Sequence, residues 1–291
     1  MLKNKLKLNA KKIDIFIKKY IDKQKKSLLV NPMKYGVLSG GKKIRSSLIL
    51  SMGKLYDINP NKLLNICGAV ECIHSYSLIH DDLPCMDDDK LRRGKITTHI
   101  KFGEATAVLA GNSLLTLAFE MISDRKFNTK QVHKLEISKK LAECSGHTGI
   151  AGGQALDLEF ENKKKKFNEI INMQKKKTGK LFSFCCFAVG IVAGKKKLET
   201  NKLSKLGEDI GLLFQLADDF LDIKGNSKLT GKIVKKDKKK GKSTIINLHG
   251  YDFTYNYAIK LKKNILRKLK KHGSKANDLI NLINFILERK Y

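Results

Sequence analysis

The sequence contains few of the residues that usually separate domains. It has 291 residues but only three prolines, Pro32, Pro60 and Pro84, and no stretch rich in Gly, Ser and Pro resembles a linker. Hydrophobic residues make up 42% of the chain, which is enough for a large core. We therefore expect a single domain over residues 1–291.

Arginine is scarce, although the formal net charge is +31. Only six of the 59 basic residues are arginine, and the lysines are spread along the whole chain. Recognition of bases and phosphates in nucleic acids favours arginine gathered on one face. We therefore expect no nucleic-acid partner, although the charge would help to attract anionic substrates.

Long apolar runs and paired cysteine motifs are also missing. The longest apolar run, residues 181–193, is too short to span a bilayer and is expected to form a buried helix. The N-terminus lacks the uninterrupted apolar core of a signal peptide. The six cysteines show no metal-ligand spacing and mostly lie in apolar runs. We expect a cytoplasmic protein without an integral membrane segment.

No segment alternates convincingly between apolar and polar residues, as a half-buried strand would. Apolar residues instead recur every three or four positions, which predicts an all-α bundle. Helices are expected over about 9–27, 43–56, 61–82, 104–123, 130–149, 168–193, 201–223, 254–271 and 275–289.

Two aspartate clusters, far apart in the chain, follow long apolar stretches. They contain six candidate metal ligands, namely Asp81, Asp82, Asp87, Asp218, Asp219 and Asp222. Crowded carboxylates repel one another unless a cation neutralises them. Oxygen-only ligand sets suit Mg²⁺, which often shares its site with substrate phosphates. We predict that the clusters face each other across a cavity and hold a diphosphate through Mg²⁺.

Several long motifs resemble those of trans-isoprenyl diphosphate synthases, the polyprenyl synthetases, and most closely the bacterial farnesyl type. The two aspartate regions match ECIHSYSLIHDDLPCMDDDKLRRGKITTHIKFGEATAVLAGN and FQLADDFLDI. Further matches, in the expected order, are GGKKIRS, GGQALDLEF, KTGKLF and TGKIVKKDKKKGKST. The resemblance implies a single-domain helical bundle of the isoprenoid-synthase type around a central cavity, and a homodimer.

The resemblance also implies roles for individual residues. Asp81, Asp87 and Asp218 would bind Mg²⁺ directly, while the other three aspartates would orient waters or neighbouring groups. Three Mg²⁺ ions per site are expected, with Mn²⁺ able to substitute. Arg92 would bind the allylic diphosphate. The isopentenyl diphosphate site would consist of Lys42, Arg45, His74 and Arg93.

A further group would act on the allylic substrate. Lys177 and Lys232 would neutralise the leaving diphosphate, and Lys242 would reach the site from a nearby loop. The oxygens of Thr178 and Gln215 would stabilise the allylic cation through their dipoles, without acting as nucleophiles.

Product length is expected to depend on the tunnel beneath the first aspartates. Tyr76 and Ser77 point into it, and the size of Tyr76 favours a fifteen-carbon product, farnesyl diphosphate. A geranyl or geranylgeranyl product remains an alternative. The sequence departs from the family pattern at four positions without loss of a proposed ligand: Ser46, Asn112, Ala217 and Asn226.

Other functional classes fit less well. A terpene cyclase would carry a different second aspartate motif, and an inactive regulatory subunit would usually lack one cluster. In a helical metal phosphohydrolase, His80 and Asp81 would form a metal pair, but a separate histidine ligand would also be needed. GKST at 241–244 is not a P-loop, because lysine occupies position 236 where glycine is required.

Overall fold

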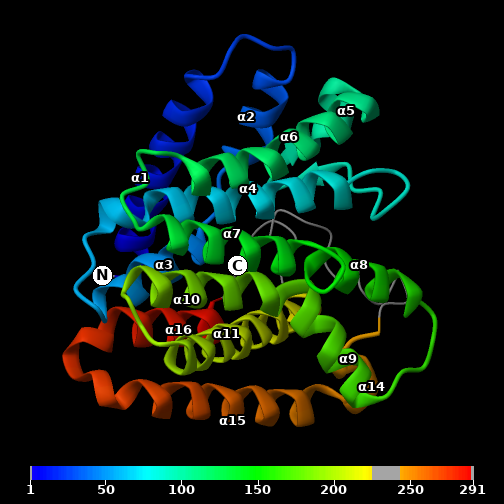
Figure 1. Ribbon diagram of the computed structural model, residues 1–291. Coiled ribbons are helices and arrows are strands. Elements are labelled where there is room, and N and C mark those ends of the chain that lie inside the picture. The colour runs from blue at the N-terminus through cyan, green and yellow to red at the C-terminus, as the bar shows by residue number, and fades with distance from the viewer. Residues whose placement is uncertain (1, 225–242, 290–291) are drawn as a thin grey trace. The chain divides into compact units, whose positions relative to one another are not determined.

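Helices joined by short connectors account for nearly all of the described chain in the computed structural model, which describes residues 2–224 and 243–289 (Figure 1). The chain divides into two units. The first unit comprises residues 1–50 and 58–138, and the second comprises residues 51–57 and 139–291. The all-α prediction is confirmed, with one small exception described below.

The first unit is built around two long helices that pack lengthwise, α4 and α6 (Figure 1). Its elements are α1 (Leu2–Asp22), α2 (Val30–Val37), the first part of α3 (Ile44–Lys54), the 3₁₀ turn η1 (Pro60–Leu63), α4 (Leu64–Asp81), β1 (Leu91–Arg92), β2 (Lys95–Ile96), α5 (Thr98–Phe102), α6 (Glu104–Ser123) and the first part of α7 (Gln131–Ser145). Apolar residues cover most of the circumference of α4, so the helix that ends in the first aspartates is central to this unit.

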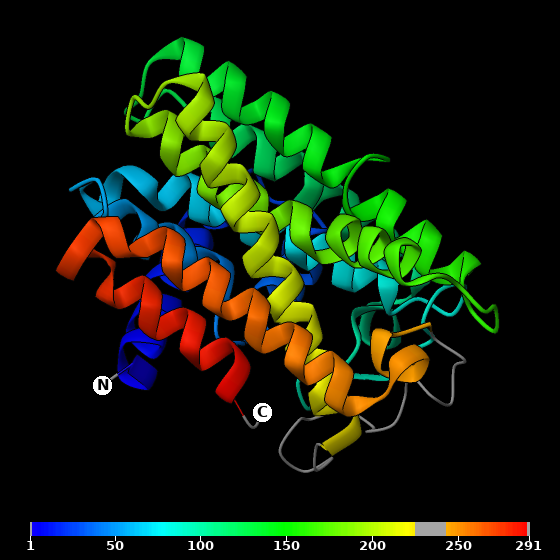
Figure 2. The same cartoon turned by 90° about the horizontal axis from the view of Figure 1, so that it is seen from below.

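The second unit is built around α10 and α11, which pack side by side (Figure 2). Its remaining elements are α8 (Ile150–Glu159), α9 (Phe167–Gln174), the π-helical turn η2 (Lys175–Gly179), α10 (Lys180–Val192), α11 (Lys197–Lys224), α14 (Ile245–His249), α15 (Tyr251–Leu269), the 3₁₀ segment η3 (Lys270–Ala276) and α16 (Asn277–Glu288). α15 and α16 also contact α11, which carries the second aspartate cluster.

Two predictions about secondary structure were wrong. The expected continuous helix over 168–193 is interrupted by the π-helical turn, because one turn there contains an additional residue. The expected absence of strands fails at an antiparallel ladder of two residue pairs, Leu91 with Ile96 and Arg92 with Lys95. Four short helices, α2, α5, α8 and α14, were also not predicted. The π-helical turn and the two-stranded ladder both contain or adjoin predicted site residues.

One described helix, α6, is long and apolar enough to cross a membrane by length and composition. Its apolar residues are interrupted by polar ones, so it contains no apolar run as long as residues 181–193. Its buried residues include Ala110, Leu114, Ala118 and Met121, at the spacing of one helix face, and the helix packs against α4. This packing favours the interpretation of α6 as a core helix.

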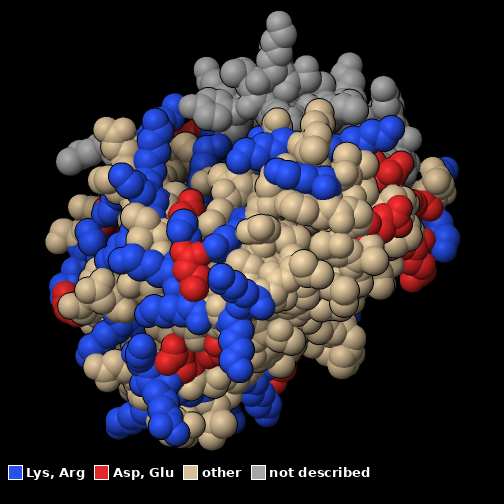
Figure 3. Space-filling view, turned by 90° about the horizontal axis from the view of Figure 1, so that it is seen from above, with Lys and Arg blue, Asp and Glu red and all other residues tan. Residues whose placement is uncertain are grey.

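Lysine and arginine side chains are scattered over the face shown in Figure 3, where Asp and Glu lie among them.

Candidate active site

The first aspartate cluster is shaped by the end of α4. The chain turns back after Asp81, and the N–H of Asp87 donates to the carbonyl of Asp81 at 2.8 Å. The N–H of Asp89 donates to the carbonyl of Asp82 at 3.1 Å. Backbone hydrogen bonds thus hold Asp87 beside Asp81, so two predicted ligands that are six residues apart become neighbours.

The two arginines that follow lie in a tight hairpin. Arg93 and Gly94 connect β1 to β2 with φ angles of 54° and 74°. Positive φ at both central residues characterises a type I′ turn, which matches the twist of paired strands. Arg92 lies in β1 and Arg93 in the turn, and their side chains bind different groups.

Arg92 is bound to the acidic loop. Its Nε donates to both carboxylate oxygens of Asp82, at 2.9 and 3.1 Å, and its Nη2 also contacts Asp82 and lies 3.3 Å from Asp89. Burial alone would lower the pKa of Arg92, but the hydrogen bonds and charge of Asp82 raise it. Asp82 therefore has a protein cation as its partner.

Arg93 contacts the GGKKIRS segment instead. Its Nη1 lies 3.3 Å from the Ser39 hydroxyl and donates to the carbonyl of Gly40. Gly41 has a φ of 99°, and a Cβ there would lie 2.7 Å from the guanidinium carbon of Arg93. Glycine at this position thus allows the arginine to lie against the backbone.

His74 lies near several of these cations. Its pKa is lowered well below the ordinary value by burial, and then by the charges of Arg45 and Arg93. A neutral imidazole among guanidinium groups favours an anionic ligand. Arg45 and Arg93 are thus close enough to act on His74 electrostatically, while Lys42, three residues before Arg45, is half-buried. Lys43 is the buried lysine of this motif, with its ammonium 3.4 Å from Asp14.

The two predicted product-length residues lie in the last turns of α4. The Tyr76 ring packs edge-on against His80 at a centroid distance of 5.6 Å, and the Ser77 hydroxyl donates to the carbonyl of His74 at 3.0 Å. Nε2 of His80 lies 3.1 Å from the carbonyl of Val108, so His80 has a hydrogen-bond partner within the first unit. A surface hollow of about 470 Å³ lies elsewhere, between α2 and α5, and none of the predicted site residues lines it.

In the second unit, the π-helical turn presents the KTGKLF motif. Nζ of Lys177 donates to Oδ2 of Asp157 on α8 at 2.5 Å. A Cβ on Gly153 would lie 2.1 Å from the backbone nitrogen of Lys177, so only glycine permits this approach of α8. Helix α8 therefore holds both the backbone and the side chain of Lys177.

A chain of hydrogen bonds links the turn to the second aspartates. The Thr178 hydroxyl donates to Oε1 of Gln215 at 2.7 Å, and Nε2 of Gln215 donates to Oδ1 of Asp219 at 2.9 Å. Nε2 of Gln174 donates to the other oxygen of Asp219, also at 2.9 Å. Two predicted catalytic residues and one predicted cluster residue are thus directly connected.

The first residue of the second cluster has a partner near the C-terminus. Nη2 of Arg289 donates to Oδ1 of Asp218 at 2.6 Å and to the carbonyl of Phe214 at 3.2 Å. The guanidinium also lies 3.9 Å from the centroid of the Phe214 ring. Asp222, four residues after Asp218, shares that face of α11.

The donor chemistry of the aspartates fits magnesium. Asp81 with Asp87, and Asp218 with Asp222, provide hard oxygen donors on short segments. Over residues 2–224 and 243–289, no group of three or more His, Cys, Asp or Glu residues is close enough to hold a metal ion. Mg²⁺ is usually bound by one or two carboxylates together with waters and substrate phosphates, so such pairs are suitable.

Some predicted residues are not described by the structure, and some residues of the candidate site were not predicted. Lys232, Lys242 and Asn226 lie outside the described residues. Asp157, Gln174 and Arg289 were not predicted, although Asp157 lies in the quoted GGQALDLEF motif. Gln154 in the same motif is 6% exposed, and its amide has no hydrogen-bond partner within the described ranges. Its burial without a partner suits a ligand contact.

The family model for polyprenyl synthetase matches residues 26–283 and so extends through both units. The chain belongs to the polyprenyl synthetase family. It is 40% identical to farnesyl diphosphate synthase of Escherichia coli over 266 residues, which is 90% of this chain and 89% of that protein.

Solved structures of polyprenyl synthetases agree with this assignment. An FPP/GFPP synthase from Zymomonas mobilis has a TM-score of 0.87 and 36% identity, covering 98% of each chain. A geranyltransferase from Helicobacter pylori, complexed with magnesium and isoprenyl diphosphate, has a TM-score of 0.81 and 30% identity, covering 99% of this chain and 96% of that one. The resemblance of the motifs is thereby confirmed.

Proposed function

We propose that this chain condenses isopentenyl diphosphate with dimethylallyl diphosphate and then with geranyl diphosphate, and so forms farnesyl diphosphate. The observation that carries the proposal is the hydrogen-bonded chain from Thr178 through Gln215 to Asp219, with Lys177 on the adjacent π-helical residue. It joins cation-stabilising oxygens to a diphosphate-binding cluster. The similarity to farnesyl diphosphate synthase of E. coli supports the choice of product.

The reaction would proceed by ionisation, condensation and elimination. The C–O bond of the allylic substrate breaks to give an allylic cation and diphosphate, with Lys177 neutralising the leaving group. The double bond of isopentenyl diphosphate then attacks the cation. A proton is finally lost, and the departing diphosphate is a suitable base because no side chain is required for that role. Lys232 would also neutralise the leaving diphosphate, and Lys242 would reach the site from a nearby loop.

The residues of the first unit would bind the second substrate. The charges of Arg45 and Arg93 act on His74, and Lys42 lies three residues before Arg45 in the sequence, which supports a diphosphate held without metal. Arg92 would exchange part of its contact with Asp82 for the allylic diphosphate. These fixed cations position the substrate double bond, which lowers the entropic part of the barrier.

Bound Mg²⁺ would supply charge stabilisation for the departing diphosphate. Asp81, Asp87 and Asp218 would hold it directly, and Asp82, Asp219 and Asp222 would orient waters and neighbouring groups. The proposal includes three Mg²⁺ ions per active site, which Mn²⁺ could replace. The H. pylori structure, with its magnesium and isoprenyl diphosphate, supports the metal and the substrate class.

Incubation of the purified chain with isopentenyl diphosphate, dimethylallyl diphosphate and Mg²⁺, followed by sizing of the products, tests the function. We expect a fifteen-carbon product. Asp81→Asn and Asp218→Asn should each lower kcat by at least about a hundredfold, because a removed ligand weakens stabilisation of the leaving group, while helical content stays unchanged. Release of phosphate without condensation would instead indicate the phosphohydrolase alternative.

Product length is a separate part of the proposal. The Z. mobilis protein is named for two products, FPP and GFPP, so the fifteen-carbon product needs its own test. Tyr76→Ala should shift the products toward twenty carbons if the ring closes the tunnel. Ser123→Ala, on the exposed end of α6, serves as the control. Unchanged products from Tyr76→Ala would place the tunnel floor elsewhere.

A single functional domain, a central cavity, a homodimer and a cytoplasmic location complete the proposal. The family model that spans both units supports the single domain. The packing of α6 against α4 supports the expectation of no integral membrane segment. Isopentenyl and allylic diphosphates are the expected small-molecule partners, and no nucleic acid is expected.

A further inference from the structure

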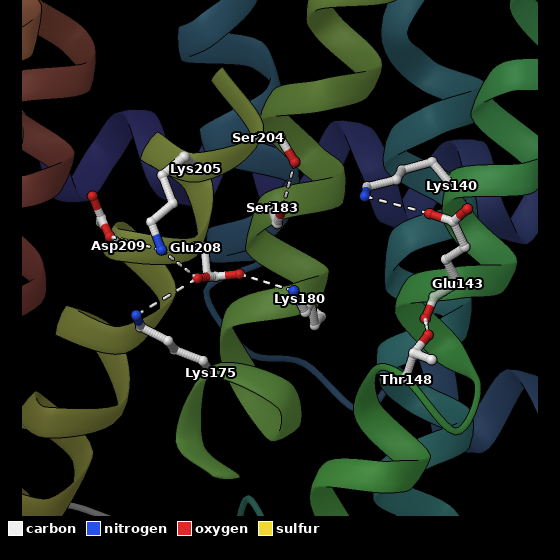
Figure 4. A network of polar contacts seen from close by, with 10 residues as sticks. All are labelled: Lys140, Glu143, Thr148, Lys175, Lys180, Ser183, Ser204, Lys205, Glu208 and Asp209. Carbon is white, nitrogen blue, oxygen red and sulfur yellow. Dashed lines mark hydrogen bonds and ion pairs between the residues drawn. The ribbon is translucent and has the colours of Figure 1, made fainter. Parts of the chain in front are cut away.

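A polar cluster in the second unit has no place in the proposed chemistry. Figure 4 shows Glu208 of α11 among three lysines. Oε2 of Glu208 accepts from Lys180 at 2.9 Å, and Oε1 accepts from Lys205 at 2.7 Å and lies 3.8 Å from the ammonium of Lys175. The Glu208 side chain is only 12% exposed, so these pairs are less screened by water than ordinary surface pairs.

The positions of the lysines in the chain are informative. Lys175 is the first residue of the π-helical turn, and Lys180 directly follows its last residue, Gly179. The carboxylate of Glu208 therefore contacts both ends of the turn. Lys177 and Thr178 lie between these two contacts.

Helix α11 contacts the turn at a second level as well. Glu208 and Gln215 are seven residues apart, so they lie on the same face about two turns from each other. Gln215 accepts the hydrogen bond from Thr178. A Cβ on Gly211, between these levels, would lie 2.7 Å from Cα of Gly179, so the backbones approach closely there.

The electrostatics of the cluster favour an ionised Glu208. Burial would raise its pKa, but hydrogen bonds from Lys205 and Lys180 lower it. Burial, and then the charge of Lys205, lower the pKa of Lys175. Three ammonium groups repel one another when no carboxylate lies between them. The neighbouring carboxylate of Asp209 is 2.8 Å from Lys268 and 4.0 Å from Lys205.

We propose that Glu208 is a positioning residue of the allylic site, which fastens both ends of the π-helical turn to α11 and thereby fixes Lys177 and Thr178. Its kinetic consequence rests on the proposed function, whereas its structural consequence does not. π-Helical turns often occur at functional sites, and this turn needs an anchor at each end to keep its irregular geometry.

The kinetic test uses Glu208→Gln, which removes the charge but keeps the size of the side chain. We expect KM for the allylic diphosphate to rise about tenfold, since small displacements of positioning groups are costly. KM for isopentenyl diphosphate should stay unchanged, because its predicted site lies in the first unit. A merely structural defect would lower the active fraction and leave both KM values as they are.

Hydrogen exchange followed by mass spectrometry gives a readout that does not depend on activity. Peptides that cover residues 175–183 should exchange about tenfold faster in Glu208→Gln than in the wild type, because the turn loses its anchor. If the wild type makes no prenyl product but exchange responds as expected, the proposed function fails and the positioning role stands.

Matched variants separate fastening from a general effect of charge. Lys180→Gln removes one attachment of the turn and should reproduce part of the effect. Lys205→Gln removes a partner that is outside the turn and should behave nearly as the wild type. Glu143→Gln, in an exposed pair 3.4 Å from Lys140 (Figure 4), should change neither readout. Equal effects of Lys180→Gln and Lys205→Gln, or unchanged kinetics and exchange in Glu208→Gln, would overturn the proposal.

Discussion

At the scale of residues, arginine is used where its shape matters. Four of the six arginines, Arg45, Arg92, Arg93 and Arg289, contribute to the candidate active site. A guanidinium presents several donors in a fixed plane, which an ammonium cannot do. The motifs predicted three of these residues. Arg289 was not predicted, because its contact with Asp218 joins positions 71 residues apart. The scarcity of arginine in a chain with 59 basic residues could have drawn attention to it.

Ser46 stands where the family pattern has proline, and its surroundings give a physical reason for the difference. The residue is fully buried, and its hydroxyl donates to Oε1 of Glu71 at 2.8 Å. Its N–H also donates to this oxygen, at 3.2 Å. As the third residue of α3, Ser46 has no intrahelical acceptor for that N–H. Proline would lack both donors.

We predict that Ser46→Ala lowers the free energy of unfolding by about 1–3 kcal/mol, because a buried carboxylate oxygen loses a hydrogen bond. Urea denaturation followed by circular dichroism measures this change. Ser123→Ala, whose hydroxyl bonds carbonyls of its own helix at an exposed position, should change stability by less than about 0.5 kcal/mol. A similar small effect of Ser46→Ala would mean that the Glu71 contact contributes little.

At the scale of elements, regular helices were predictable and local irregularities were not. The expected helix over 104–123 coincides with α6, because its apolar face continues from end to end. The π-helical turn lies in the polar segment KKKTG between two apolar stretches, where the sequence has no marker for one additional residue. The close approach of Gly153 to Lys177 involves residues on two helices, so periodicity within one segment cannot reveal it.

The hairpin before α5 shows a different limit. Arg93-Gly94 is a plausible two-residue turn, but each strand has only two residues, too few for an alternating pattern. The functional assignment of Arg92 and Arg93 to different substrates came from motif resemblance. In the structure, the strand residue contacts Asp82 and the turn residue contacts Gly40.

Gly153→Ala tests whether the packing of α8 against the π-helical turn is needed. The added Cβ would overlap backbone atoms of Lys177 and Lys176, which cannot rotate away. We expect a loss of about 1–3 kcal/mol in the free energy of unfolding, even though alanine favours helices by about 1 kcal/mol over glycine. Turnover should also fall, because Lys177 is displaced. Chemical denaturation and steady-state kinetics measure the two effects.

The matched control is Ala155→Gly at an exposed position of the same helix. It removes a methyl group without a packing change and should lower stability by about 1 kcal/mol, through helix propensity alone, while turnover stays normal. If Gly153→Ala were as stable and as active as the wild type, the close contact between α8 and the turn would be unimportant.

At the scale of the whole molecule, the sequence predicts which residues belong to the candidate active site better than it predicts their positions in space. The ordered motifs identified both aspartate clusters, and backbone hydrogen bonds hold Asp87 beside Asp81 in the first of them. The two clusters lie in different units, and no pattern within one segment of the sequence encodes the distance between residues so far apart in the chain. The net charge of +31 likewise indicated no location for the site, because the lysines are scattered (Figure 3).

The predicted homodimer can be tested at an exposed apolar surface of the first unit. Ile100 of α5 and Val108 and Leu109 of α6 are 52%, 38% and 51% exposed, which is unusual for large apolar side chains that lie close together in the sequence and can signify an interface. We expect the wild type to show twice the chain mass in light scattering after size exclusion. Leu109→Glu should yield monomers, because a charge would be buried without a partner.

Leu198→Glu provides the control, since Leu198 is 68% exposed at the start of α11 in the second unit. This variant should keep the mass of a dimer. A monomeric wild type would contradict the homodimer prediction directly. A dimer that survives Leu109→Glu would instead place the interface on another surface, because an unpaired carboxylate at the centre of an apolar contact costs several kcal/mol. The two variants together therefore locate the interface as well as count the subunits.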